Sequence, residues 1–448
     1  MLVNFSVENW MSFRGKAEFS MVATKERQHS DRIAFVKKYR TKILPVSAIY
    51  GGNASGKTNL CKALKFVKSF VVNGTSPDAS INLQPFILDS SKIDEPINFS
   101  FELLIDETVY KFSFAATKEK VLEERLTKVF STTEKDLYVR KERKVTFPGL
   151  SKAKKEEAFF KYASKKDERN NQLFITSSVL QDVEDFRPIY DWFKYSLVMI
   201  APDARFGEFE LFLDEKSPLY SKMNEVLSRL DTGIINLKTE ERPFPFDEIS
   251  IPESVKNNLI KDLEKNKTIK IQGVPFAFSL KDGKVVVKGL TSYHKKIDGS
   301  KAKFELEQES DGTLRAIDLL PAFIMLSSND MENKVFVIDE IDRSLHTLLT
   351  KNLLEMYLSS CSAETRNQLL FTTHDVLLMD QDLFRRDEMW VTERGSDGTS
   401  SLFSFSEYKD VRYDKDIRKS YLQGRLGGIP NILLGGIQKN SCNSAKKR

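Results

Sequence analysis

The chain has 448 residues and a mass of 51.4 kDa, and 40% of its residues are hydrophobic and 30% charged. At roughly 150 residues per domain this length predicts about three structural units, and the composition excludes a wholly disordered chain. The first residues lack the basic start and long apolar core of a signal peptide. The longest strongly apolar stretch, around Leu319 to Leu326, is far shorter than the ~20 residues that span a bilayer. With its three cysteines scattered singly, the chain is expected to be cytoplasmic.

The charged residues are unevenly distributed along the chain. There are 69 basic and 64 acidic residues, and the net charge of +5 does not by itself indicate a nucleic-acid partner. Lysines concentrate between Lys256 and Lys303, and a second basic segment runs from Lys141 to Arg169. Two interpretations stay open, because such runs usually form solvated faces but can also form an electropositive surface for DNA, RNA or an acidic protein.

The N-terminal part of the chain predicts strands, then a helix, then strands again. The apolar run from Pro45 to Tyr50 is typical of a strand buried on both faces, and apolar residues recur at helical spacing from Lys57 to about Val72. Alternating residues from Ile97 to Phe130 predict an antiparallel meander. The lysine- and glutamate-rich stretch from Ser151 to Asn171 predicts a solvated helix or a linker.

The middle of the chain is mixed, and its C-terminal part alternates between helices and strands. The pattern favours helices near 179–193 and 221–230, and a hairpin with its turn at 281–284. Further helices are expected at 313–327 and 345–359, and buried strands at 335–338 and 368–372. Strands that alternate with helices indicate a mostly parallel sheet of the α/β class. We therefore expect an N-terminal lobe over 1–150, an inserted helical or mixed subdomain over 151–300, and a C-terminal lobe over 301–448.

The segment from Gly51 to Thr58 fits the pattern G-x-x-x-x-G-K-[ST], with an apolar strand before it and an amphipathic helix after it. Backbone N–H groups in such a loop surround phosphates, helped by the positive end of the helix. Lys57 is expected to reach the β- and γ-phosphates, and the Thr58 hydroxyl to hold Mg²⁺. The predicted residues for binding ATP are Gly51, Asn53, Ala54, Ser55, Gly56, Lys57, Thr58 and Asn59.

Two further strands end in residues that suit phosphate chemistry. The strand up to Ile338 is followed by Asp339 and Glu340. We expect Asp339 to bind Mg²⁺ directly or through water, and Glu340 to act as general base on the attacking water. His374 follows the apolar strand from Gln368, where a side chain can approach a γ-phosphate and take part in catalysis. His346 is as compatible with a structural role as with a functional one.

A second anion site is predicted directly before the helix that starts at Leu314. The Ser310 side chain and the Gly312 amide lie at the N-terminus of that helix, where anions are favoured. Without the other motifs, Ser310 would simply be a good N-cap.

The order of these motifs resembles that of ABC-type ATPase heads, and residues Val7 to Phe13 are similar to the first strand of the SMC, RecF and OLD branch. The resemblance implies an ABC-type P-loop head, with a mostly parallel sheet flanked by helices and an antiparallel β subdomain. It implies roles that are matched residue by residue: Lys57 and Thr58 as Walker A, Ser310 and Gly312 as signature, Asp339 and Glu340 as Walker B, His374 as switch histidine, and Gln84 as the Q-loop glutamine and a metal ligand.

The chain departs from the ABC pattern at three positions. Ala54 stands where many such loops have glycine, which need not matter if only backbone amides are used. Asp311 replaces a signature glycine, and His346 occupies the position of the D-loop aspartate. The exact contacts of the signature are therefore open.

A narrower resemblance, to ATPases of bacterial anti-phage operons, covers most of the chain. It is carried by Tyr50 to Leu60, by Asp414 to Asp416 and by Tyr421 to Pro430. The chain most resembles the ATPase subunits of PARIS-type defence systems. This implies an ATP-bound homo-oligomer that holds a separately encoded Toprim nuclease until a phage protein, possibly one that imitates DNA, is sensed. Unlike OLD nucleases, the chain has no second acidic cluster after an apolar strand beyond His374, so we do not expect a nuclease site within it.

Two other functions remain open from the sequence. A RecF-like DNA-repair ATPase would use the basic segment 256–303 to grip duplex DNA. A transporter ATPase would need a membrane partner and usually has a closer LSGGQ-type signature.

Overall fold

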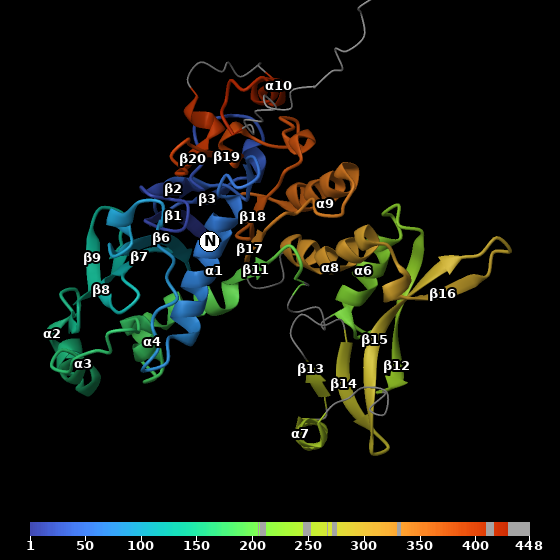
Figure 1. Cartoon of the computed structure of the whole chain (residues 1–448), viewed down its shortest axis with the longest axis horizontal. Helices are drawn as coiled ribbons and strands as arrows, with labels where there is room; N and C mark the ends of the chain where they lie inside the picture. The colour runs from blue at the N-terminus through green and yellow to red at the C-terminus, as the bar shows by residue number, and fades with distance from the viewer. Residues whose placement is uncertain are drawn as a thin grey trace, which may run out of the picture.

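The computed structural model describes residues 1–204, 206, 212–244, 252–266, 268–270, 276–328, 333–408 and 416–428. The described strands form sheets of seven, six, five and two strands. The seven- and six-stranded sheets lie side by side with helix α1 (Lys57–Asn73) running along them, and the five-stranded sheet projects away from them (Figure 1).

The six-stranded sheet is parallel except at one edge. Its order is β11 (Leu197–Ile200), β17 (Val335–Ile338), β18 (Gln368–Thr372), β5 (Val46–Tyr50), β19 (Met389–Arg394) and β20 (Ser400–Ser404), and only β20 runs antiparallel to its neighbour. Every residue of the three central strands is buried, which is why they appear in the sequence as unbroken apolar runs. The predicted parallel sheet is confirmed.

Helices cover both faces of this sheet. Alternate residues such as Val335, Val337 and Leu370 pack into one core with α1, whereas Phe336, Ile338 and Phe371 pack into a second core. The second core holds the apolar residues of α8 (Asp311–Leu326) and α9 (Thr347–Ser360), which confirms the two predicted helices. The chain therefore has the α/β class and the P-loop head architecture expected from its sequence.

The seven-stranded sheet is antiparallel and confirms the predicted meander. Phe99, Phe101 and Phe112 point from it into the core that α1 shares. Its order is β10 (Lys144–Thr146), β9 (Glu134–Lys141), β8 (Val121–Val129), β7 (Thr108–Ala116), β6 (Ile97–Ile105), β1 (Leu2–Glu8) and β2 (Ala17–Ser20). The small β3–β4 pair (Ala34–Val36 and Thr41–Ile43) lies between β2 and β5 in sequence.

The segment after β10 forms short helices instead of one long one. These are α2 (Lys152–Glu156), α3 (Ala158–Ala163), α4 (Phe174–Val179) and α5 (Arg187–Asp191), followed by a π-helix over Trp192–Ser196. The helix predicted near 179–193 is thus broken. Asp182 adopts a left-handed φ of 55°, and Pro188, which has no N–H to donate, lies in the first turn of α5.

A buried ion pair holds this helical segment against the seven-stranded sheet. Glu124 accepts hydrogen bonds from the backbone N–H groups of Phe174 (2.6 Å) and Ile175 (3.0 Å), and Arg140 donates to the carbonyls of Gln172 and Arg169. Both charged side chains are 0% exposed. Residues of α3 to α5 therefore pack into the core of the N-terminal lobe, while the predicted division of the chain into 1–150, 151–300 and 301–448 stays a prediction.

The projecting five-stranded sheet carries the lysine-rich segment. It consists of β12 (Ile234–Pro243), β13 (Thr268–Lys270), β14 (Phe276–Lys281), β15 (Lys284–Lys295) and β16 (Lys301–Glu305), with α6 (Pro218–Leu227) and α7 (Glu253–Asn266) beside it. The predicted hairpin is confirmed, because Asp282 (φ 51°) and Gly283 (φ 73°) form the two-residue turn between β14 and β15. Part of the positive charge is neutralised locally, since Lys303 contacts Glu240 and Glu305.

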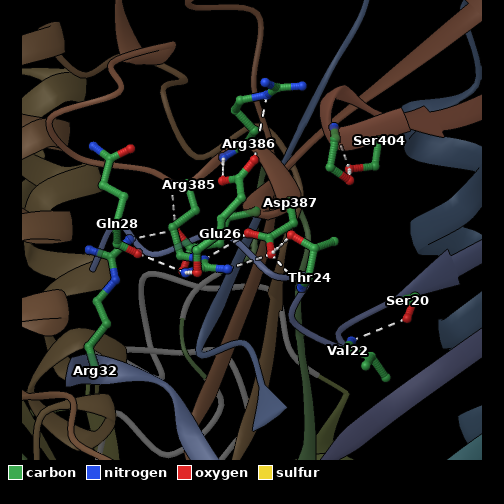
Figure 2. Close-up of polar contacts among 12 residues, drawn as sticks. Ser20, Val22, Thr24, Glu26, Gln28, Arg32, Arg385, Arg386, Asp387 and Ser404 are labelled. Atoms are coloured by element: carbon green, nitrogen blue, oxygen red, sulfur yellow. Dashed lines mark hydrogen bonds and ion pairs between the residues drawn. The ribbon is translucent and has the colours of Figure 1, made fainter. Parts of the chain in front are cut away.

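A buried network of charges joins the chain before β3 to the chain before β19 (Figure 2). The Arg385 guanidinium donates to both carboxylate oxygens of Asp387 at 2.8 and 2.7 Å, and Asp387 also accepts from Thr24. Nearby, Arg32 pairs with Glu388, whose pKa burial raises to about 7 against the opposing effect of Arg32. Buried charges of this kind are tolerated only when paired, so the network fixes how the two segments meet.

The described C-terminal part ends in α10 (Ile417–Leu422). None of the helices in the described ranges has the length and apolarity that crossing a membrane requires.

Candidate functional site

The carboxyl ends of β5, β17 and β18 meet at one edge of the parallel sheet and bring the predicted motifs together there. A pocket of about 850 Å³ opens at this edge. Its wall includes residues 53–59 of the glycine loop and α1, residues 83–88, Glu340 and His374. Ligands of open α/β sheets characteristically bind at this edge, so the pocket is the candidate functional site.

The glycine loop is held close to β19 and β20. A Cβ atom on Gly51 would lie 2.4 Å from Oγ1 of Thr392, and one on Gly56 would lie 2.7 Å from Oγ of Ser400. Both glycines have φ values outside the range of ordinary side chains, 150° and 118°. Ala54, at the position where the sequence departs from glycine, adopts a left-handed φ of 59°. The close approach and the backbone conformation explain why glycine is required at 51 and 56.

Lys57 is a buried cation at the base of the pocket, with an exposed fraction of 4%. Its Nζ donates to the carbonyl oxygens of Gly51 (2.8 Å) and Gly52 (3.1 Å). Burial lowers the pKa of Lys57 to about 8, and the carboxylates of Asp339 and Glu340 oppose this effect. A phosphate in the pocket would stabilise the charged form further.

Thr58 and Asp339 supply neighbouring oxygen atoms at the start of α1. Thr58 Oγ1 lies 3.5 Å from Asp339 Oδ1. A hydroxyl and a single carboxylate suit Mg²⁺, which keeps several waters and is usually completed by substrate phosphates. In the described part of the chain, no group of three or more His, Cys, Asp or Glu side chains could hold a metal by itself. A magnesium ion at this position would be held by Thr58 and Asp339, with waters and phosphate oxygens as its other ligands.

Glu340 and His374 face the same pocket. Glu340 has a left-handed φ of 51°, and its Oε1 lies 4.0 Å from Nε2 of His374. Nδ1 of His374 lies 3.4 Å from Nζ of Lys57. Burial and the charge of Lys57 lower the pKa of His374, so its imidazole is neutral near pH 7. Glu340 and His374 can together accept or relay a proton beside Lys57.

The remaining predicted residues are placed differently from one another. Asn59 lies on the pocket wall and donates to Ser12 Oγ at 2.8 Å. Gln84 also lies on the wall with its side chain exposed, and its role as a metal ligand stays a prediction. Gly51 lies behind the loop, where its carbonyl accepts from Lys57. His346 is the N-cap of α9, and its Nδ1 accepts from the N–H of Leu348. This contact gives His346 a structural role at the start of the helix.

The signature residues do not line this pocket. Exposed Ser310 is the N-cap of α8 and accepts from the N–H of Thr313 at 3.1 Å. Gly312 is packed against the loop after β17, because a Cβ there would lie 2.7 Å from the carbonyl oxygen of Ser344. The predicted second anion site is therefore on a different surface from the glycine loop of the same chain.

Part of the pocket wall carries no residue that was predicted from the sequence. Ile87 and Leu88, 70% and 60% exposed, lie there with Arg394 and Gly398. No motif marks these residues, which come from the turn at 87–88, from the end of β19 and from the turn after it. The one signal in the sequence is the pair of adjacent aliphatic residues, Ile87 and Leu88, that starts three positions after Gln84.

Residues 46–380, more than half of the chain, match the family described as "AAA domain, putative AbiEii toxin, Type IV TA system". Among solved structures, the "SMC head domain from Thermotoga maritima" has 14% sequence identity and a TM-score of 0.37, over 90% of this chain and 98% of that chain. The "SmcHead bound to the C-winged helix domain of ScpA" has 12% identity and a TM-score of 0.36, over 90% and 97%. No curated protein matches the sequence.

We predict that Lys57→Ala removes measurable ATP binding and leaves the fold intact. The substitution removes charge-assisted hydrogen bonds to phosphate, each of which contributes about 1.5–3 kcal/mol, and no apolar packing. Binding of a labelled ATP analogue and circular dichroism would measure the two effects. Lys62→Ala, an exposed lysine one turn further along α1, is the matched control and should bind like wild type. An unchanged affinity in folded Lys57→Ala would contradict the assignment of the loop.

Proposed function

The chain belongs to the family described as an AAA domain and putative AbiEii toxin of a type IV TA system, and from this we propose that its pocket binds Mg²⁺·ATP and hydrolyses it. The observation that carries the proposal is the convergence of buried Lys57, Glu340 and His374 on one pocket, with Asp339 placed behind Thr58 of the same wall. The metal ion, when bound, neutralises phosphate charge.

Each side chain then has a separate task. Lys57 and the loop amides bind and orient the phosphates, and Thr58 with Asp339 holds the ion. Glu340, on the pocket wall, takes the proton of the attacking water, which is general base catalysis. Neutral His374 is close enough to Glu340 to orient that water or the terminal phosphate.

We expect Glu340→Gln to bind ATP but to hydrolyse it roughly 10²–10⁴-fold more slowly, because the amide keeps the shape of the side chain and loses its basicity. Single-turnover hydrolysis and nucleotide affinity should be measured together. Glu225→Gln is the control and should keep wild-type turnover. Glu225 lies on α6 and forms an exposed ion pair with Arg229. Near-normal hydrolysis by Glu340→Gln would assign the base to another residue.

The same proposal includes a homo-oligomer, at least a dimer, in which each ATP site is completed by a second chain. Two observations support it: Ser310 is exposed at the N-terminus of α8, and neither Ser310 nor Gly312 lines the pocket of its own chain. A helix N-terminus that is free to face outward suits the terminal phosphate bound by a partner.

Mixing Ser310→Arg chains with Lys57→Ala chains should therefore restore part of the ATPase activity, because one site of each mixed dimer has both residues intact. Mixing Lys57→Ala with Glu340→Gln is the control and should restore nothing, since both changes damage the same half of the site. ATPase assays on mixed oligomers verified by native mass spectrometry would test this. Equal activity in the two mixtures would count against a shared site.

At the level of the cell, we propose a cytoplasmic sensor or scaffold of the PARIS type in bacterial anti-phage defence. It would hold a separately encoded Toprim nuclease until a phage protein triggers release. The motif resemblance supports this role, and so does a family description that names a toxin of a toxin–antitoxin system. The exposed lysines at the turn between β15 and β16 offer an electropositive surface for an acidic trigger that imitates DNA.

Reversing the charge of Lys295 and Lys296 should weaken binding of the nuclease or trigger and leave ATP affinity unchanged. The loss should be greatest at low salt, because the Debye length of ~8 Å at physiological ionic strength shrinks as salt rises. Reversal of Lys301 and Lys303 should add less, since these lysines already contact Asn236 and Glu240. Co-purification with the product of the neighbouring gene at two salt concentrations is the measurement. Tight binding of duplex DNA instead, without a nuclease gene nearby, would favour a RecF-like repair ATPase.

A further inference from the structure

Thr372, the last residue of β18, bridges the two acidic residues of the site with one hydroxyl group. Its side chain is 0% exposed, and its Oγ1 lies 2.5 Å from Asp339 Oδ1 and 2.8 Å from the backbone nitrogen of Glu340. The backbone N–H of Glu340 can only donate, so the hydroxyl oxygen of Thr372 accepts this hydrogen bond. The hydroxyl proton is thus directed at the Asp339 carboxylate.

The main chain of Thr372 contributes a third bond to the same turn. Its carbonyl oxygen accepts from the N–H of Ile341 at 3.0 Å. Between these bonds lies Glu340, whose left-handed φ of 51° is uncommon for a residue with a side chain. The hydrogen bonds from 340 and 341 to one residue of the neighbouring strand hold this conformation, which turns the Glu340 side chain into the pocket.

Another fully buried threonine, Thr350, offers a matched comparison. Thr350 of α9 is also 0% exposed, and its Oγ1 has no hydrogen-bond partner among the described residues. The Thr372 hydroxyl, in contrast, donates to the carboxylate of Asp339 and accepts from the backbone N–H of Glu340.

We propose that Thr372 is a positioning residue for the magnesium site and the general base. It holds the Asp339 carboxylate in place beside Thr58 and sets the backbone of Glu340, without touching nucleotide itself. The inference rests on the proposed ATPase function. Residues that orient metal ligands typically change metal affinity or activity 10–100-fold when they are replaced.

The test is Thr372→Val, which has nearly the same shape and no hydroxyl, compared with Thr372→Ser, which restores the hydroxyl. Binding of Mn²⁺ to the ADP complex, followed by electron paramagnetic resonance, should weaken roughly 10–100-fold in the valine variant and return towards wild type in the serine variant. Affinity for a fluorescent ATP analogue in EDTA should not change, because Lys57 and the loop are untouched. Turnover with Mg²⁺ should fall in parallel with Mn²⁺ binding.

Thr350→Val is the matched control, and it should keep wild-type Mn²⁺ binding. If Thr372→Val fails to fold, Thr372→Ala provides the same deletion of the hydroxyl with less bulk in the core. Wild-type Mn²⁺ affinity in folded valine or alanine variants, or a serine variant as weak as valine, would overturn this inference alone. A wild-type chain without nucleotide-dependent Mn²⁺ binding would overturn the proposed function as well, so the two failures are distinguishable.

Discussion

The hydrogen-bonded pairing of β5 with β18, and of β18 with β17, is the constraint on which the site depends. These strands come from distant parts of the chain, yet their register places Thr372 beside Ile49 and Phe371 beside Ile338. Because the strands are parallel, the residues that follow them emerge at one edge. A shift of register by one residue would turn buried side chains to the opposite face and separate Lys57 from Asp339.

The glycine loop also packs against β19 and β20, the edge of this sheet that no sequence motif marks. β19 pairs with β5, and Thr392 Oγ1 lies 2.6 Å from Ser55 Oγ. The chain enters β19 directly from the buried network of Arg385, Asp387 and Glu388. This network costs desolvation energy, and removing one partner from such a buried pair typically destabilises a protein by about 3–5 kcal/mol. The network lies directly before β19, the strand whose Thr392 contacts the glycine loop.

The electrostatics of the pocket follow from burial. Lys57, at 4% exposure, has a pKa of about 8 and is charged near neutral pH, while His374 is neutral beside it. Of these two groups, only Lys57 then presents a positive charge to the space between the glycine loop and Glu340. That arrangement suits an anion whose charge is partly balanced by a divalent ion, and it leaves the imidazole available for a proton.

Much of the site could be predicted because its motifs are local. The P-loop needs glycine at fixed positions before a helix, and a strand buried on both faces appears as an unbroken apolar run followed by Asp339 and Glu340. The β14–β15 hairpin was predictable for the same reason, because Asp282 and Gly283 accept the left-handed backbone that the turn requires.

The loop, the acidic pair and the alternation of strands and helices could therefore be predicted from local sequence patterns. Tertiary contacts were needed to show that the helix expected near 179–193 is broken, that Ser310 lies outside the pocket, and that Thr372 hydrogen-bonds to Asp339 and Glu340. The physical reason is that periodicity records whether a residue is buried, whereas its hydrogen-bond partner depends on the register of strands far apart in the chain.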